Sequence, residues 1–302
     1  MIDVRGLRKA YRNGVVAVDD LDITIDGAGV HGFLGPNGSG KTTTIRCLLG
    51  LIRPSAGEVR IHGVDTTSSL HSVIDRVGAL VETPKFFPNF GGRKNLRLLA
   101  GVTGIPDTRV DECLEIVGLS DRGKDRFGTY SLGMKQRLAV AATLLKDPDL
   151  IVLDEPANGL DPAGIVEIRQ LIRSLGEQGK TIFVSSHQLG EVQQTCDEVM
   201  IISKGRLVRR GPVAEIASLG AGQDQVVSIP NVPDAMAVLQ QAGFTVRPGM
   251  EPETLLVQTD PASAAAITKT LADAGHYLRG LRSSEASLES VFLELTRGEG
   301  SL

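Results

Sequence analysis

The chain has 302 residues, of which 41% are hydrophobic and 23% are charged, enough for one large globular domain and a smaller one. Its net charge of −4 argues against a nucleic-acid-binding surface, and its three separated cysteines indicate neither a disulfide framework nor a zinc site. No apolar run approaches the roughly 18 residues that span a bilayer, and the first residues lack the apolar core of a signal peptide.

Residues 2–25 alternate in polarity in the manner of β-strands, and Asn13 followed by Gly14 is a strong hairpin-turn signal. A further strand and turn are predicted at residues 57–63, so we expect a small antiparallel layer. Tyr11 lies just before the hairpin turn. Its ring could stack on a purine, although an aromatic residue in a strand more often serves packing alone.

A phosphate-binding loop is predicted between a buried strand at residues 30–34 and a helix at residues 43–49. Its glycines let successive backbone N–H groups face an anion, and the helix N-terminus adds partial positive charge. Lys41 is expected to reach the outer phosphates of a nucleoside triphosphate, and the Thr42 hydroxyl to hold a magnesium ion. The loop fits the pattern of a glycine, four free positions and Gly-Lys-Thr, and comprises Gly35, Pro36, Asn37, Gly38, Ser39, Gly40, Lys41, Thr42 and Thr43.

A strand predicted at residues 77–82 ends in the carboxylate of Glu82. Proline and glycine residues follow, and helical patterns then occur at residues 95–100, 110–117 and 132–145. We expect these helices to form a separate lobe over about residues 85–148.

Two acids follow four apolar residues at the end of a predicted central parallel strand, residues 150–155. Next to a phosphate-binding loop, Asp154 is a candidate magnesium ligand and Glu155 a candidate to orient or deprotonate water. Two acids at a strand end are otherwise often solvated loop residues. The next buried strand, residues 181–184, leads to His187, which can donate to a γ-phosphate, although a lone loop histidine is usually structural.

The last third of the chain indicates a second domain. A hairpin over residues 199–208 closes the first domain, and a glycine-rich linker follows at residues 219–222. We therefore assign residues 1–219 to an ATP-binding domain and residues 222–302 to an accessory domain. The accessory pattern is strand 225–229, helix 234–242, strands 244–247 and 254–259, helix 262–274, strand 277–281 and helix 288–295, a ferredoxin-like order.

The order of these motifs resembles that of ABC-transporter ATPase subunits over about residues 1–215. Residues 130–134 match the family signature at Ser131 and Gly133, and residues 158–161, which end in Asp161, resemble the D-loop. The resemblance implies an α/β P-loop NTPase fold with an antiparallel layer and a helical lobe, besides the ferredoxin-like accessory domain. It also implies that Tyr11 stacks on adenine and that Asp154 is the Walker B acid. Glu155 would be the catalytic base and His187 the switch histidine.

In this family the signature helix of one subunit meets the γ-phosphate that the other subunit holds. The resemblance therefore implies that two ATP molecules, with Mg²⁺, are sandwiched between two copies of the chain in a head-to-tail dimer. It also implies separately encoded permease subunits, which would hold the chain in the cytoplasm at the inner face of the cell membrane.

Glu82 stands where the family usually has the Q-loop glutamine, which touches magnesium and contacts the permease. We expect Glu82 to take a catalytic and metal-binding role there. Its surroundings are similar to those in ATPases of bacitracin and lantibiotic exporters. Residues 287–295 resemble the C-terminal segment of multidrug and anthracycline exporter ATPases.

The leading hypothesis is an ATPase that powers export of an antibiotic or drug-like compound. The alternatives are the ATPase of another ABC-2-type export system and a regulatory module that hydrolyses poorly. An ABC protein that acts on ribosomes or DNA is disfavoured, because no heptad run separates Lys41 from Asp154 and the chain is acidic.

Overall fold

The structure is a computed structural model that describes residues 1–82, 85–219, 224–249, 251–259, 264–283 and 292. It divides the chain into two compact units, Met1–Val213 and Ala214–Leu302. The first unit thus ends six residues before the boundary predicted at residue 219. Most of the predicted linker and of the predicted helix at residues 288–295 lies outside the described residues.

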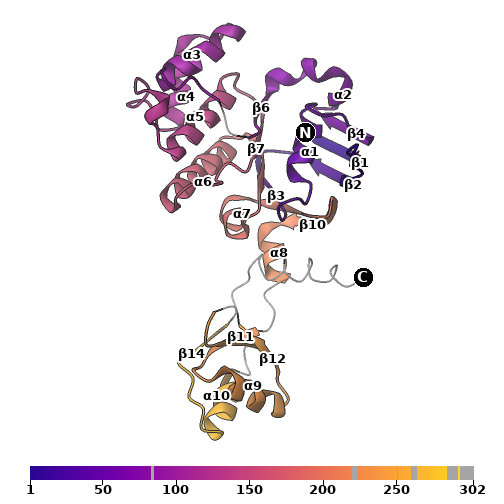
Figure 1. Ribbon diagram of the computed structural model, residues 1–302, viewed down its shortest axis with the longest axis vertical. Coiled ribbons are helices and arrows are strands. Elements are labelled where there is room, and N and C mark those ends of the chain that lie inside the picture. Colours follow the sequence, from indigo (N-terminus) through magenta and orange to yellow (C-terminus); the bar gives the residue numbers. More distant parts are fainter. Residues whose placement is uncertain (83–84, 220–223, 250, 260–263, 284–291, 293–302) are drawn as a thin grey trace. The chain divides into compact units, whose positions relative to one another are not determined.

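A six-stranded sheet forms the centre of the first unit (Figure 1). Its outer strand β10 is antiparallel to β9, and the other neighbours are parallel. The strands lie in the order β10 (Arg206–Pro212), β9 (Glu198–Ser203), β3 (Gly29–Leu34), β8 (Thr181–Ser186), β7 (Leu150–Asp154) and β6 (Val77–Leu80). β7 and β8 are buried along their whole length, which explains their nearly continuous apolar runs.

The predicted antiparallel layer is confirmed as a second sheet. Its strands lie in the order β2 (Val16–Ile25), β1 (Ile2–Ala10), β4 (Ala56–Ile61) and β5 (Val64–Asp65). The predicted hairpin turn joins β1 to β2, where the N–H of Tyr11 donates to the carbonyl of Val15 over 2.8 Å. Gly14 has a φ of +86°, which glycine adopts without strain.

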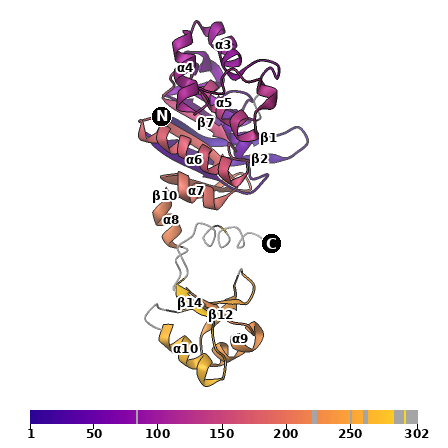
Figure 2. The same ribbon diagram turned by 90° about the vertical axis from the view of Figure 1, so that its left-hand side faces the viewer.

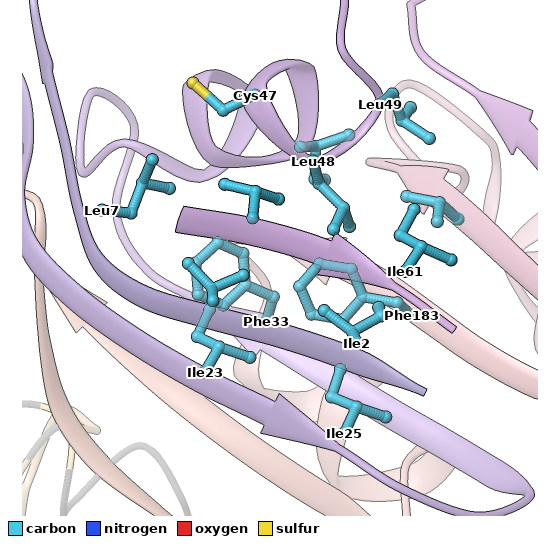
Figure 3. Packing of buried hydrophobic residues seen from close by; sticks show 14 of the residues in the cluster. Ile2, Leu7, Ile23, Ile25, Phe33, Cys47, Leu48, Leu49, Ile61 and Phe183 are labelled. Atoms are coloured by element: carbon cyan, nitrogen blue, oxygen red, sulfur yellow. The ribbon is translucent and has the colours of Figure 1, made fainter. Parts of the chain in front are cut away.

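Helix α1 (Lys41–Leu48) packs in the main core, between the antiparallel layer and the six-stranded sheet (Figure 3). The rings of Phe33 and Phe183, from β3 and β8, lie with their centroids 5.3 Å apart at the centre of this core. Helices α6 (Pro162–Glu177) and α7 (Leu189–Thr195) lie beside each other near the other face of the sheet (Figure 2). The core thereby holds β3, β7 and β8 rigidly side by side.

Three helices form the predicted lobe: α3 (Gly92–Thr103), α4 (Asp107–Ile116) and α5 (Leu132–Leu144) (Figure 1). The buried side chain of Asn95 anchors the segment before α3, because its Oδ1 accepts a hydrogen bond from the N–H of Phe87 over 2.8 Å. The strand predicted at residues 77–82 ends at Leu80 instead. Glu82 has a φ of +68°, in the left-handed region that an extended strand does not use.

Short helical segments connect these elements. They are α2 (Thr66–Ser69) and the 3₁₀ turns Leu70–Ser72, Ile74–Arg76 and Phe127–Thr129. The described part of the chain contains no helix that combines the length and the apolar character needed to cross a membrane.

Among the described residues after α8 (Val213–Leu219), the second unit confirms the predicted ferredoxin-like order of α9 (Val232–Gln241), α10 (Ala264–Asp273) and four antiparallel strands. Strand β14 begins three residues later than the predicted strand at residues 277–281. After α8, the elements are β11 (Asp224–Ser228), α9, β12 (Thr245–Pro248), β13 (Thr254–Gln258), α10 and β14 (Gly280–Ser283).

We predict that Phe183→Ala lowers the free energy of unfolding by about 3–5 kcal/mol, because it leaves a cavity at the centre of the main core. Urea denaturation followed by circular dichroism measures this loss. Phe87→Ala removes the same side chain where it is 59% exposed and should cost about 1 kcal/mol or less. Equal losses in the two variants would contradict the assigned core.

Candidate active site

Three loops meet at one edge of the six-stranded sheet because of the strand register. Leu34 at the end of β3 lies opposite Ser186 of β8, and Asp154 at the end of β7 lies opposite Ser185. When parallel strands are paired in this way, the loops that follow them begin side by side. The phosphate-binding loop, the acid after β7 and the histidine after β8 therefore start next to one another.

The side chain of Glu155 contacts both a cation and an imidazole at this edge. Its Oε1 lies 3.2 Å from Nζ of Lys41, and its Oε2 lies 2.7 Å from Nδ1 of His187. Lys41 is 5% exposed, and its ammonium also donates to the carbonyls of Gly35 over 2.7 Å and Pro36 over 3.3 Å. A buried ammonium requires such partners. The structure thus brings together the lysine, glutamate and histidine that were predicted from three separate motifs.

A cavity of about 410 Å³ opens beside these side chains, within the size range of small-molecule sites. Eight of its lining residues were predicted as site residues. The lining consists of Val15, Ala17, Asn37, Gly38, Gly40, Lys41, Thr42, Thr43, Glu155, Asn158 and His187. Val15 and Ala17 were not predicted as site residues, because two apolar residues of a strand carry no signal of a ligand.

The donor atoms at the cavity fit a nucleotide bound with magnesium. Thr42 brings a hydroxyl to the cavity lining. Asp154, which is 8% exposed and precedes the lining residue Glu155, is not itself in the lining but brings a carboxylate at the same sheet edge. Such oxygen ligands suit Mg²⁺, which binds through one or two carboxylates together with substrate phosphates. In the described part of the chain, no three His, Cys, Asp or Glu side chains gather into a metal site.

The loop backbone approaches β2 so closely that Gly40 has no room for a side chain. Its φ is +108°, and a Cβ atom there would lie 2.4 Å from the carbonyl oxygen of Ala17. Because Ala17 and Lys41 both line the cavity, this contact fixes the width of the cavity between the hairpin and the loop.

A hydroxyl that was not predicted from the sequence connects the two acids. Ser185 Oγ donates to Oδ1 of Asp154 over 2.5 Å and accepts from the N–H of Glu155 over 3.0 Å. A serine within a buried strand gives no sequence signal, because only the pairing of β7 with β8 places it between these acids.

The following hydroxyl organises the loop that carries His187. Ser186 Oγ accepts from the N–H of Gln188 over 3.0 Å and donates to Oε2 of Glu191 over 3.2 Å. Burial raises the pKa of the Glu191 carboxyl above its ordinary value. The two backbone segments that flank His187 are therefore tied to each other and to α7.

Tyr11 lies beside the loop but not on the cavity wall. Its hydroxyl is 3.3 Å from Oγ1 of Thr43, and its ring centroid is 5.4 Å from Nζ of Lys9. The ring is therefore near the phosphate-binding loop, and its stacking on adenine stays a prediction.

Ser131, Gly133 and Asp161 belong to two adjacent helix N-termini. Ser131 caps α5 by accepting from the N–H of Met134 over 3.2 Å, and Asp161 caps α6 by accepting from the N–H of Gly164 over 3.1 Å. A Cβ atom on Gly133 would lie 3.7 Å from the Cα of Gly164, so the two helices pack closely there. In the described part of the chain, none of the three predicted residues lines the cavity.

Glu82 lies apart from the cavity lining and forms an ion pair with Arg46 of α1. Its side chain is 66% exposed. The catalytic and metal-binding role expected for Glu82 stays a prediction, and the geometry gives it a contact with the helix that follows the phosphate-binding loop.

Comparisons with known proteins identify the family of the chain. The family model described as ABC transporter matches residues 18–158. The bacitracin transport ATP-binding protein BcrA of Bacillus licheniformis is 48% identical over 214 residues, 70% of each chain. The chain belongs to the ABC transporter family. As a member of that family, it binds nucleotide and hydrolyses ATP.

Two further ABC transporter proteins extend the comparison. The daunorubicin resistance ATP-binding protein DrrA3 of Streptomyces coeruleorubidus is 33% identical over 302 residues, 98% of this chain and 95% of the relative. The solved structure of cbiO1 from Clostridium perfringens, part of the ABC transporter complex cbiONQ, superposes with a TM-score of 0.66 at 27% identity. The superposition covers 72% of this chain and 90% of the cbiO1 chain. The predicted fold of the ATP-binding domain is thereby confirmed.

We predict that Gly40→Ala weakens ATP binding at least about tenfold, because the added Cβ forces the loop away from the carbonyl of Ala17. Calorimetric titration with ATP measures this affinity. Gly179→Ala is the matched control. Gly179 has a φ of +90°, and no atom lies within 4 Å of the position that a Cβ would take there, so that variant carries the backbone strain without the clash. Equal affinity in the two variants would contradict the close approach.

Proposed function

We propose that the chain is the ATP-hydrolysing subunit of an ABC exporter that moves an antibiotic or drug-like compound through separate permease subunits. The contact of Glu155 with both Lys41 and His187 carries the hydrolytic part of this proposal. The export part is supported by relatives that are named for bacitracin transport and daunorubicin resistance.

The proposed general base is Glu155. Its carboxylate contacts Lys41 through Oε1 and His187 through Oε2. His187 keeps the carboxylate oriented, and Oε1 can accept a proton from a water at the cavity once Lys41 has turned to the phosphates. His187 uses Nδ1 for its contact with Glu155, which leaves its other ring nitrogen for the γ-phosphate. Magnesium held by Thr42 and Asp154 would neutralise charge on the phosphate oxygens.

Lys41 changes partner when ATP binds. Its ammonium now contacts Glu155 and two loop carbonyls. Phosphate oxygens carry more negative charge than these carbonyls and therefore compete for the ammonium. Release from Lys41 leaves Glu155 held by His187 and free to take up a proton.

A second copy of the chain would complete the site. The helix N-terminus that Ser131 caps attracts anions, and it belongs to a 13-residue helix. Among the described residues, Ser131 and Gly133 do not line the cavity of the chain to which they belong. A head-to-tail dimer places them, with Asp161, against the ATP that the partner holds.

An apolar groove beside the outer strand β6 suits the permease. The groove measures about 470 Å³ and lies between β6, α3 and α5, with Leu80, Leu99 and Ala142 in its lining. β6 is an edge strand, so a segment of another protein can approach it freely. Docking there would hold the chain at the inner face of the cell membrane.

We predict that Glu155→Gln lowers the ATP turnover rate by ~10² to 10⁴, because the amide cannot accept the proton. Phosphate release measures turnover, with Mg²⁺ and with EDTA, and light scattering follows the oligomeric state. ATP binding should be retained, and an ATP-bound dimer should accumulate. Glu177→Gln makes the same substitution at an exposed position of α6 and should leave turnover unchanged.

Unchanged turnover in Glu155→Gln would exclude the assigned base. A wild-type chain that binds ATP but shows neither turnover nor dimer formation would favour the alternative of a poorly hydrolysing regulatory module.

A further inference from the structure

We propose that Ser185 is a positioning residue that holds both acids of the active site in their working geometry. This inference rests on the roles proposed above for Asp154 and Glu155. Ser185 lies near the end of β8, where its side chain is fully buried. It faces the neighbouring strand β7 at the position paired with Asp154.

One hydroxyl group serves two different atoms. Ser185 Oγ donates its proton to the carboxylate of Asp154 over 2.5 Å and accepts the backbone N–H of Glu155 over 3.0 Å. A hydroxyl has one donor and two acceptor sites, so it makes both bonds at once. Ser185 thereby fixes the side chain of the first acid and the backbone of the second.

The backbone of Glu155 needs this support. Its φ of +50° lies in the left-handed region, which residues other than glycine rarely adopt without local stabilisation. The chain leaves β7 at this point, and the N–H of Glu155 is held by the serine hydroxyl instead of by a strand partner. This conformation turns the Glu155 side chain toward Lys41 and His187.

The same strand carries a second buried hydroxyl that makes no contact with the site. Thr181 is 1% exposed, and its Oγ1 donates to the carbonyl of Gly27 over 2.7 Å at the other end of β8. Ser185 and Thr181 thus share strand, burial and a hydrogen-bonding hydroxyl. They differ in whether the hydroxyl holds a reacting group, which makes Thr181 the matched control.

The test compares Ser185→Ala with Thr181→Val in ATP turnover, KM for ATP and thermal unfolding. Ser185→Ala should lower kcat by about 10- to 100-fold, because displacing a reacting group by about 1 Å can cost ~10²-fold. KM for ATP should stay within about threefold, since the residue does not touch the nucleotide. The Mg²⁺ concentration for half-maximal rate should rise. Thr181→Val should keep kcat within about twofold at a similar loss of Tm.

The residual turnover of a double variant distinguishes a role through Glu155 from a merely structural role. Saturating Mg²⁺ offsets the loss of the hydrogen bond to Asp154, so under that condition adding Ser185→Ala to Glu155→Gln should lower the residual turnover no further. Calorimetric ATP binding by that double variant should equal binding by Glu155→Gln alone. If Ser185→Ala fails to fold, Ser185→Cys keeps the size with a weaker donor and should show the same split between kcat and KM.

A kcat for Ser185→Ala within twofold of wild type, or equal losses in Ser185→Ala and Thr181→Val, would overturn the inference. A further loss of turnover in the double variant at saturating Mg²⁺ would also overturn it. If Glu155→Gln itself turns over normally, the proposed function fails instead, and the two failures are thereby distinguished.

Discussion

The contact between Lys41, Glu155 and His187 is the interaction on which the rest of the site depends. Lys41 is almost fully buried, and an ammonium in that position is costly unless a carboxylate and carbonyl oxygens surround it. Glu155 provides that charge before ATP binds. The same carboxylate is the proposed base, so we propose that the arrival of phosphates at Lys41 also releases the base.

The sheet supplies the positions for this contact. β3, β8 and β7 are neighbours, and their register places the ends of all three strands at one edge. The Phe33 and Phe183 rings pack between these strands and the antiparallel layer, so the strand ends cannot shift independently. Two hydroxyls then hold the residues that follow the strand ends. Ser185 accepts the backbone N–H of Glu155, and Ser186 accepts the backbone N–H of Gln188, next to His187.

Much of this arrangement could be predicted from the sequence because each motif is local. The phosphate-binding loop needs its glycines and its lysine at fixed spacing, and a run of four apolar residues before Asp154 indicates a central strand. Strand pairing is not local, which is why Ser185, Val15 and Ala17 gave no signal. The predicted end of β6 was wrong, because the apolar run at residues 77–81 gives no sign of the left-handed backbone conformation of Glu82.

Lys41 joins the loops after β3, β7 and β8 into the proposed ATP site. Calorimetric titration of wild type and Lys41→Met with ATP, in the presence of Mg²⁺, tests it most directly, with thermal unfolding as the check on folding. We expect wild type to bind ATP and Lys41→Met, still folded, to bind it at least about tenfold more weakly. Equal affinity in the two proteins would contradict it.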